Sequence, residues 1–381
     1  MQNYTMKKVL IVNNNLDMGG IQKSLINLLK AMHDKCEITL LLFSKSGALL
    51  NEVPADVTVI TPLKCYRILG LSKKELKKHP LLFCMKALML KCAGLFSRRS
   101  VMKALGVLQK KIIGYDVVIS YSHLQNDKYF ANGCGDFVLD HTICENKVCL
   151  IHCDYLNSGC MSDKNNSEYA EFDRIACCSD SVRERFLQGS NLNPEKVYTL
   201  RNFYDPDIVS LANESPYIYN DKYINVLTVA RLSSEKGMDR AIEALSASKR
   251  RDINYYIVGD GPQKELLYQK IKDCHLEKQV FLLGEQQNPY RYMANADYLL
   301  VPSLHEAAPM VFDEANMLGL KVLSTNTTSA VEMIGDNGMI CDNSTQGIES
   351  VLSVLTKSVG EKSCLKTNEL QMQQLFEILS Q

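Results

Sequence analysis

Residues 298–315 read YLLVPSLHEAAPMVFDEA, and they are the most informative stretch for the architecture. The run 298–301 is short, apolar and continuous, which predicts a strand that is buried on both faces. A polar loop follows, and Pro309 is well placed to open a helix because proline suits the first helical position. The order of strand, loop and helix predicts one βα unit of a parallel sheet.

The same alternation of apolar runs and helical periodicity continues along the whole chain. The first half contains strand candidates at 9–12, 38–43, 57–60, 117–120, 148–152, 174–179 and 197–200. The second half contains strand candidates at 224–229, 255–258, 280–283, 298–301 and 321–324. Continuous apolar strands that are joined by helices predict an α/β protein with parallel sheets covered on both faces.

The length of 381 residues is suited to two domains of ordinary size. The segment 206–221 is polar, contains two prolines and shows little periodicity, so we expect a linker there. We therefore expect two Rossmann-like, doubly wound domains, at 1–205 and 222–381, which face each other across a cleft. Ligands should bind in that cleft, beyond the carboxyl ends of the strands. The final helix could pack back on the first domain.

Basic side chains are concentrated in one segment, although the chain has 43 Lys+Arg and 43 Asp+Glu. Between positions 64 and 111 there are thirteen basic residues and one acid, Glu75, a formal charge of +12. An apolar helical run at 81–96 lies inside this segment, and such a helix suits an anionic lipid surface. A solvated basic helix that covers the sheet is the alternative. The residues expected at a membrane are Lys73, Lys74, Lys77, Lys78, Phe83, Lys86, Arg98 and Arg99.

Several other classes of protein are not expected. Nucleic-acid binding is not expected, because the basic segment lacks interleaved aromatic residues and the chain contains no recognised nucleic-acid-binding module. A signal peptide is not predicted because asparagines at 13–15 end the first apolar run, and no apolar run is long enough to span a bilayer. Fourteen cysteines without an export signal indicate reduced cytosolic thiols. A zinc site is disfavoured because no C-x2-C pair occurs among Cys144, Cys149, Cys153 and Cys160, with His141 and His152 close by.

Two loops of the second domain carry residues that suit phosphate and sugar chemistry. Arg231 can fork onto phosphate oxygens and Lys236 supplies a mobile charge, although either residue alone would read as a solvated surface charge. Glu306 lies in the loop before the helix that Pro309 opens, and Glu314 lies within that helix. Carboxylates accept hydrogen bonds from vicinal hydroxyls, and free helix N-terminal amides suit a phosphate. Glu314 could also be a surface acid that the helix dipole favours.

The loop after the first strand reads NNNLDMGG at 13–20 and ends on two adjacent glycines, Gly19 and Gly20. Two glycines at a helix start let the backbone approach an anion closely. The loop is not a G-x-G-x-x-G motif, and no acid is suitably placed to hold a ribose after the second strand. A nicotinamide dinucleotide site is therefore not supported. A simple glycine-rich turn remains an alternative for this loop alone.

Together these motifs resemble the family-4 retaining glycosyltransferases of the GT-B fold, of the bacterial polysaccharide-assembly type. The E-x7-E motif is matched by Glu306 and Glu314, and the R-x4-K-G element by Arg231, Lys236 and Gly237. Further pieces follow in the family's order: Gly19-Gly20, VGDGP at 258–262, Leu283-Gly284 and NAD at 295–297. One departure is Ala307, where many members of the family have glycine.

The resemblance implies a set of site residues. The residues implied as catalytic are Glu306, His152, Arg231 and Lys236. Those implied to bind the donor are Gly19, Gly20, Arg231, Lys236, Gly261, Gly284, Glu306, Ala308, Pro309, Met310, Val311 and Glu314. In this scheme the basic pair neutralises a diphosphate, Glu314 holds the ribose, Glu306 holds the transferred sugar, and His152 faces that sugar.

The function implied is retaining transfer of a hexose or N-acetylhexosamine from a nucleotide-sugar, with UDP favoured. The acceptor would be a glycan, expected to be lipid-linked, in the synthesis of a cell-surface polysaccharide such as a capsule. The enzyme would be cytoplasmic and peripheral on the inner face of the cell membrane, with no metal or other cofactor. Two alternatives stay open, which are a nucleotide-sugar epimerase of the same fold and a non-catalytic protein that binds nucleotide-sugars.

Overall fold

The structure is a computed structural model that describes residues 6–357 and 367–380. The chain divides into two compact units. Unit 1 consists of residues 1–203 with 368–381, and unit 2 of residues 204–367. Both are parallel α/β units, so the predicted fold class is confirmed.

Unit 1 contains a seven-stranded parallel sheet in the order β3-β2-β1-β4-β5-β6-β7. The order reverses beside β1, which pairs with β2 through Ile11 and Leu40 and with β4 through Ile11 and Ile119. Such a reversal leaves a crevice at the carboxyl ends of the strands, where ligands bind in this class of sheet. The strands are β1 (Lys8–Asn13), β2 (Glu37–Leu42), β3 (Thr58–Ile60), β4 (Val117–Ser120), β5 (Lys147–Ile151), β6 (Arg174–Cys177) and β7 (Val197–Thr199).

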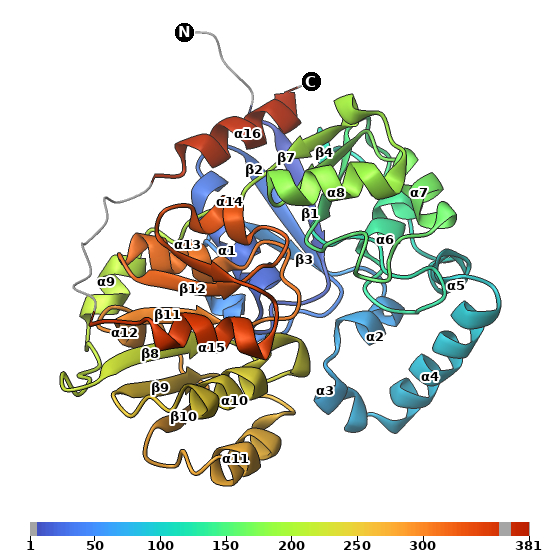
Figure 1. Cartoon of the computed structure of the whole chain (residues 1–381). Helices are drawn as coiled ribbons and strands as arrows, with labels where there is room; N and C mark the ends of the chain where they lie inside the picture. The colour runs from blue at the N-terminus through green and yellow to red at the C-terminus, as the bar shows by residue number, and fades with distance from the viewer. Residues whose placement is uncertain (1–5, 358–366, 381) are drawn as a thin grey trace, which may run out of the picture. The chain divides into compact units, whose positions relative to one another are not determined.

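Helices cover the sheet of unit 1 on both faces (Figure 1). Several begin at a serine whose side chain accepts a hydrogen bond from the first turn, as Ser97, Ser162 and Ser179 do. The helices are α1 (Gly20–Met32), α2 (Arg67–Gly70), α3 (Lys73–Lys77), α4 (Pro80–Leu95), α5 (Arg98–Leu105), α6 (Cys134–His141), α7 (Asp163–Ala170), α8 (Asp180–Ser190) and α16 (Glu369–Ser380).

The last helix, α16, completes the core of unit 1. Leu375, Ile378 and Leu379 are each 1% exposed and belong to the same buried cluster as Val9 and Ile11 of β1. The hydrophobic contact of these side chains therefore joins the end of the chain to its first strand. The second unit ends before this helix, at residue 367.

Unit 2 contains a six-stranded parallel sheet in the order β10-β9-β8-β11-β12-β13. The strands are β8 (Ile224–Val229), β9 (Ile253–Val258), β10 (Val280–Gly284), β11 (Tyr298–Val301), β12 (Lys321–Thr325) and β13 (Gly338–Cys341). The helices are α9 (Ile208–Asn213), α10 (Met238–Ser248), α11 (Lys264–Asp273), α12 (Tyr290–Met293), α13 (Met310–Met317), α14 (Ala330–Ile334) and α15 (Thr345–Ser353).

The segment predicted as a linker, 206–221, packs as part of unit 2 instead. Ile208 and Ala212 of α9 are 0% and 1% exposed and lie in a buried cluster of unit 2. Tyr219 packs edge-on against Tyr256, and its hydroxyl donates a hydrogen bond to the carbonyl of Tyr292. No periodic pattern marks this segment because its apolar residues are spread over a short helix and an extended stretch.

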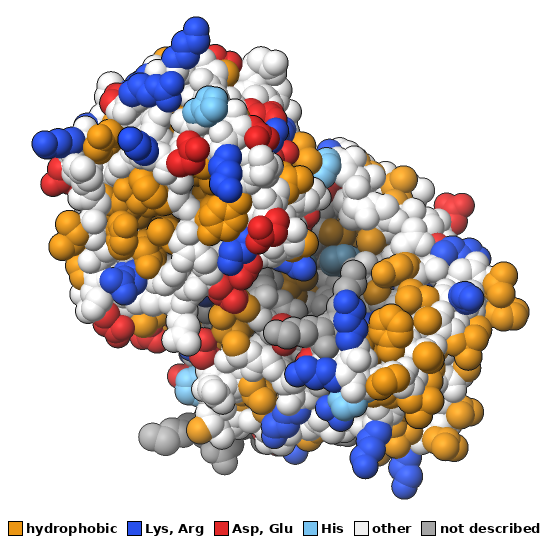
Figure 2. Space-filling view, turned by 90° about the horizontal axis from the view of Figure 1, so that it is seen from below, with side chains coloured by type: hydrophobic (Ala, Val, Ile, Leu, Met, Phe, Trp, Pro, Cys, Tyr) orange, Lys and Arg blue, Asp and Glu red, His pale blue; other side chains and the backbone are white. Residues whose placement is uncertain are grey.

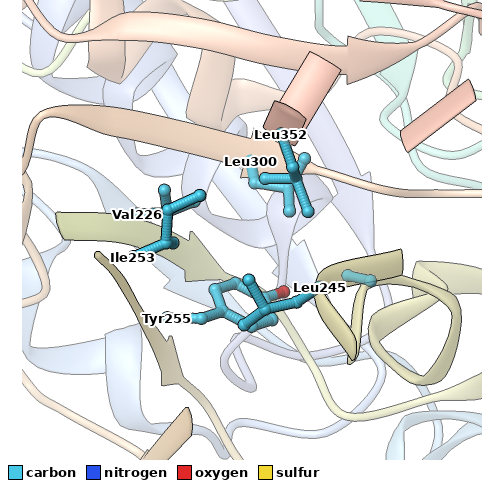
Figure 3. A pocket seen from close by; sticks show the side chains of 7 residues that line it. Val226, Leu245, Ile253, Tyr255, Leu300 and Leu352 are labelled. Atoms are coloured by element: carbon cyan, nitrogen blue, oxygen red, sulfur yellow. The ribbon is translucent and has the colours of Figure 1, made fainter. Parts of the chain in front are cut away.

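One pocket lies inside the core of unit 2 (Figure 3). Its lining is almost wholly apolar and includes Val226, Leu245 and Leu352. The space is too small to hold a water molecule, and the hydroxyl of Tyr255 at its edge is already hydrogen-bonded to Thr228. It is a packing gap of the core rather than a ligand site. Separately, none of the helices at residues 6–357 and 367–380 has both the length and the apolar character that crossing a bilayer requires.

Candidate active site

The loops that follow β8 and β11 in unit 2 are joined by polar contacts. Lys236 Nζ lies 2.7 Å from Glu306 Oε1, and Ser303 Oγ donates to the same oxygen at 2.7 Å. The backbone N–H of Leu304 donates to the carbonyl of Glu235 at 2.8 Å. The two motifs that the sequence suggested separately, R-x4-K-G and E-x7-E, thus meet through Lys236 and Glu306.

Gly237 makes this close approach of the two loops possible. It has a φ of +67°, and a Cβ atom at this position would lie 2.1 Å from the carbonyl oxygen of Pro302. Glycine is the residue that can take this conformation without a steric penalty. Arg240 also donates to the Pro302 carbonyl, at 2.5 Å, so the start of the β11 loop is fixed from two sides.

The loop after β9 supports the backbone on both sides of Arg231. The N–H groups of Ala230 and Leu232 donate to the carbonyls of Val258 and Asp260, both at 3.0 Å. Two positive-φ glycines allow this contact: a Cβ on Gly259 would lie 1.9 Å from the Ala230 oxygen, and one on Gly261 2.4 Å from the Leu232 oxygen. The backbone of Arg231 is therefore held while its side chain is exposed to solvent. A fixed backbone limits where the guanidinium can reach, and its forked N–H groups can bind an anion there.

Glu314 is a buried residue and not a solvated surface acid. It is 8% exposed, and the hydroxyl of Tyr290, from α12, donates to its Oε1 at 3.1 Å. A buried carboxylate that is held by hydrogen bonds is suited to orient a ligand hydroxyl. Pro309 is the residue just before α13, with a φ of −70°, so the helix begins at Met310, one residue later than expected. The amides of Met310 and Val311 form the first turn of α13.

The remaining predicted donor residue of unit 2, Gly284, ends strand β10. It has a φ of +73°, and a Cβ there would meet nothing within 4 Å. The turn after β10 is therefore open on this side. Ala308, also in the predicted set, is the second-to-last residue of the loop between β11 and α13.

The glycine pair of unit 1 leaves the N-terminus of α1 open. Gly19 precedes α1 in an extended conformation. No side chain caps the N-terminus of α1, and the first turn of the helix contains no acid. The three asparagines before it hold the loop in place. Asn14 Nδ2 donates to the Asn132 carbonyl at 2.7 Å, and Asn15 Nδ2 donates to the Gly70 carbonyl at 2.6 Å. The loop thus offers helix N–H groups of the kind that bind anions.

His152 directly follows β5, at the carboxyl end of the sheet of unit 1. Burial, with a smaller contribution from neighbouring His123, lowers the pKa of His152 to about 3. Its Nε2 has no hydrogen-bond partner among residues 6–357 and 367–380, and its ring lies 5.2 Å from that of Tyr121. A neutral imidazole with a free nitrogen can exchange hydrogen bonds with a ligand but carries no charge near pH 7.

His123 is a second strand-end histidine, which the sequence analysis did not single out. It follows β4, is 9% exposed, and its Nε2 lies 3.1 Å from Gln125 Nε2. The Cys160 thiol lies beside it and also contacts Cys153, and these two neighbours lower the pKa of Cys160, with Cys153 the larger cause. In the described part of the chain, no group of three or more His, Cys, Asp or Glu side chains could hold a metal ion.

Two residues expected at a membrane, Arg98 and Arg99, are engaged inside unit 1, so that prediction is wrong for them. Arg98 is 1% exposed, and its Nε lies 2.8 Å from Asp136. It also pairs with Glu168. Arg99 Nη2 lies 2.9 Å from Asp140. The acids come from α6 and α7, too far along the chain for the local charge pattern to reveal them.

The other residues of the predicted membrane set differ among themselves. Lys77 and Lys78 are exposed, and Phe83 is 50% exposed. Lys86 Nζ is turned toward the rest of unit 1 and donates to the Ile68 carbonyl at 3.2 Å. The side chains of Lys73 and Lys74 lie outside the described part of the structure.

The comparisons with known proteins fit this geometry. The family described as glycosyl transferases group 1 matches residues 213–366, which lie within unit 2. A Campylobacter jejuni protein named N-acetylgalactosamine-N,N'-diacetylbacillosaminyl-diphospho-undecaprenol 4-alpha-N-acetylgalactosaminyltransferase is 31% identical over 170 residues, 44% of this chain and 46% of that protein. The amylovoran biosynthesis glycosyltransferase AmsD of Erwinia amylovora is 26% identical over 160 residues, 39% of this chain and 46% of that one. The chain thus spans less than half the length of these curated relatives.

Solved structures extend the likeness to nearly the whole chain. Anabaena Alr3699/HepE in complex with UDP and glucose has a TM-score of 0.61 at 20% identity, over 91% of this chain and 89% of that one. A mutant of S. aureus TarM in complex with Fondaparinux, alpha-GlcNAc-glycerol and UDP has a TM-score of 0.68 at 14% identity, over 99% and 100%. At these identities the likeness shows the fold alone. The chain therefore has the GT-B fold, and its second unit matches the model of the glycosyl transferases group 1 over residues 213–366.

Proposed function

We propose that this protein is a retaining glycosyltransferase that moves a hexose or N-acetylhexosamine from a UDP-sugar to a glycan acceptor. One observation carries the proposal: Lys236 lies 2.7 Å from Glu306 within a group 1 glycosyl transferase unit. Exposed Arg231 stands on the same β8 loop, five residues before Lys236. A cationic pair next to a held carboxylate suits a sugar that is attached to a diphosphate.

The roles in unit 2 follow from how each side chain is held. Lys236 and Arg231 would neutralise the diphosphate as the bond to the sugar breaks. Glu306 accepts hydrogen bonds from Ser303 and Lys236 and would accept one more from a hydroxyl of the sugar. Buried Glu314 would hold the ribose hydroxyls. The choice of UDP is supported by the UDP-bound structures of similar fold.

Retention would come from attack on the same face of the sugar that the leaving group departs from. In this scheme Glu306 is not a nucleophile, because its carboxylate is committed to hydrogen bonds with Lys236, Ser303 and a hydroxyl of the sugar. The acceptor oxygen would bond to the anomeric carbon as the phosphate oxygen leaves, and the acceptor's proton would pass to that phosphate. Charge stabilisation and positioning would supply most of the rate. The roles of Gly19, Gly20 and His152 in unit 1 stay predictions.

The acceptor that we propose is a lipid-linked glycan at the inner face of the cell membrane, in the assembly of a cell-surface polysaccharide such as a capsule. Two observations support this choice. The name of one relative contains diphospho-undecaprenol, and another relative is named for the synthesis of amylovoran. We also propose that no metal cofactor takes part, because Arg231 and Lys236 provide the positive charge that a diphosphate leaving group needs.

The test is nucleotide release from a panel of UDP-, GDP- and ADP-sugars, with and without a polyprenyl-diphosphate-linked glycan. We expect UDP release that depends on the acceptor, an α-linked product from an α-linked donor by NMR, and an unchanged rate with a metal chelator. Glu306→Gln should abolish transfer while its circular dichroism matches that of the wild type. Conversion of the donor sugar to its epimer without acceptor would indicate an epimerase instead. Donor binding without turnover would indicate a non-catalytic protein that binds nucleotide-sugars.

A further inference from the structure

Helix α4 is apolar on nearly all sides, and its exposed side carries a stripe of leucines. Leu81, Leu88 and Leu95 recur every seven residues, so they form one stripe, and they are 75%, 62% and 77% exposed. Lys86 is turned the other way, and its Nζ donates to the Ile68 carbonyl at 3.2 Å. The helix thus exposes leucines to solvent and directs a lysine toward the rest of unit 1.

A stripe of exposed leucines is not what water favours on a surface helix. Such a helix normally buries its apolar stripe and exposes its charges. In α4, Ala93 is the only buried residue, Phe83 is 50% exposed, and Lys91 is the single charged residue on the exposed side. Phe96, directly after the helix, is 70% exposed. A continuous exposed apolar face of this kind marks an interaction surface.

The charges around α4 identify the kind of partner. Lys77 and Lys78 before the helix are exposed. Glu75, the one acid of the segment 64–111, is engaged in capping α3, where it accepts from the Ser72 N–H at 2.9 Å. The charge displayed beside the leucines is therefore carried by lysines, which suits the phosphates of anionic lipids. Figure 2 shows hydrophobic side chains gathered on the right of the view, where α4 lies, with basic side chains among and around them.

The helix is firmly attached to the body of unit 1. Three residues after its end, Arg98 is buried against Asp136 and Glu168. The contact of Lys86 with the Ile68 carbonyl adds a second attachment near the middle of the helix.

We propose that α4 is a docking surface for an anionic phospholipid bilayer and lies in the plane of the membrane. Leu81, Leu88 and Leu95 enter between the acyl chains, and Lys77 and Lys91 lie at the level of the phosphates. The 16 residues of α4 extend about 24 Å, which is too short to cross the hydrocarbon core. This inference goes beyond the proposed reaction, because docking needs neither donor nor acceptor.

The test is flotation of the full chain with vesicles of phosphatidylcholine, alone or mixed with phosphatidylglycerol, without any sugar nucleotide. We expect binding to the mixed vesicles. The triple change L81Q, L88Q and L95Q should abolish it. The triple change K77Q, K78Q and K91Q should weaken it on the order of 100-fold, since each lysine near the surface contributes a factor of about five.

Matched controls come from unit 2. The changes I218Q, L266Q and V354Q replace residues that are 87%, 49% and 65% exposed, and K222Q, K272Q and K278Q replace exposed lysines. Both triple variants should bind vesicles as the wild type does. Circular dichroism of every variant checks that it folds. Glu306→Gln should also bind normally, so failure of docking and failure of the proposed reaction can be told apart.

Three results would overturn the inference. The first is a wild-type chain that does not float with anionic vesicles even at low salt. The second is a triple leucine variant that folds and binds vesicles as well as the wild type. The third is concentration-dependent dimerisation of the wild type, lost in the triple leucine variant and without vesicle binding, which would make a second copy of the chain the occupant of this face.

Discussion

Replacing Gly237 with alanine should separate the β8 loop from the β11 loop. An alanine Cβ would lie 2.1 Å from the Pro302 oxygen, whereas ordinary contacts begin at 3.4 Å, so one of the two loops must move by at least 1.3 Å. Lys236 precedes Gly237, and Glu306 lies four residues beyond Pro302, so this movement acts on the 2.7 Å contact between Lys236 and Glu306. A displacement of about 1 Å in a positioned group costs about 100-fold in rate, or ~2.7 kcal/mol.

The measurement is kcat/KM for UDP release, together with the free energy of unfolding in urea. Gly335→Ala is the matched control, because Gly335 has a φ of +52° and a Cβ there would meet nothing within 4 Å. Both variants place an alanine at a positive φ, which costs on the order of 1–3 kcal/mol, with ψ of 21° at Gly237 and −130° at Gly335. Only Gly237→Ala should also lose activity. If it keeps the kcat/KM of Gly335→Ala, the contact between the loops does not position the site.

Three further predictions concern charged or titratable groups. Lys236→Met should lower kcat about 10²- to 10³-fold, as loss of a charge-stabilising group does. The control is Lys270→Met, which breaks a surface pair with Glu243 and should leave kcat unchanged. Equal losses of kcat in both variants would contradict the role given to Lys236. His152 has a lowered pKa of about 3 in the folded state, so the unfolded chain binds more protons between about pH 3 and 6.5. Its contribution to stability is complete above pH 6.5 and is lost as the pH falls, and the pH dependence of urea unfolding should flatten in His152→Asn but not in His275→Asn. Arg98→Met should cost about 3–5 kcal/mol of unfolding free energy, because Asp136 and Glu168 would stay buried without their partner; an unchanged urea midpoint would show that the buried cation is dispensable.

The strands were predictable because buried parallel strands are continuous apolar runs. β8 has the predicted bounds, and β1 is longer than its predicted run by one residue at each end. β13 (Gly338–Cys341) was missed because it begins with glycine, is short and lacks a run of β-branched residues. The local pattern therefore sufficed for the other strands of both sheets, three edge strands included, and failed at β13.

The candidate site was predictable as a set of residues but not as a geometry. Spacing pointed to Lys236 and Glu306, yet only the fold shows that their loops meet and that Gly237 permits the contact. Charge counting failed for Arg98 and Arg99 because their acidic partners lie on helices that are distant in sequence. An exposed charge and a neutralised one look the same in a sequence.

The position of α16 in the core of unit 1 has a consequence for how the chain folds during translation. Unit 2 is a continuous stretch, 204–367, so it can fold as soon as it has left the exit tunnel. Unit 1 is different, because its strand β1 is made before unit 2, whereas Leu375, Ile378 and Leu379 are made after it. While unit 2 is being synthesised, the surface of unit 1 that α16 later covers stays open to water and is exposed to aggregation and to chaperone capture. Strand β1 thus precedes unit 2 in synthesis but gains its final packing only after unit 2 is complete.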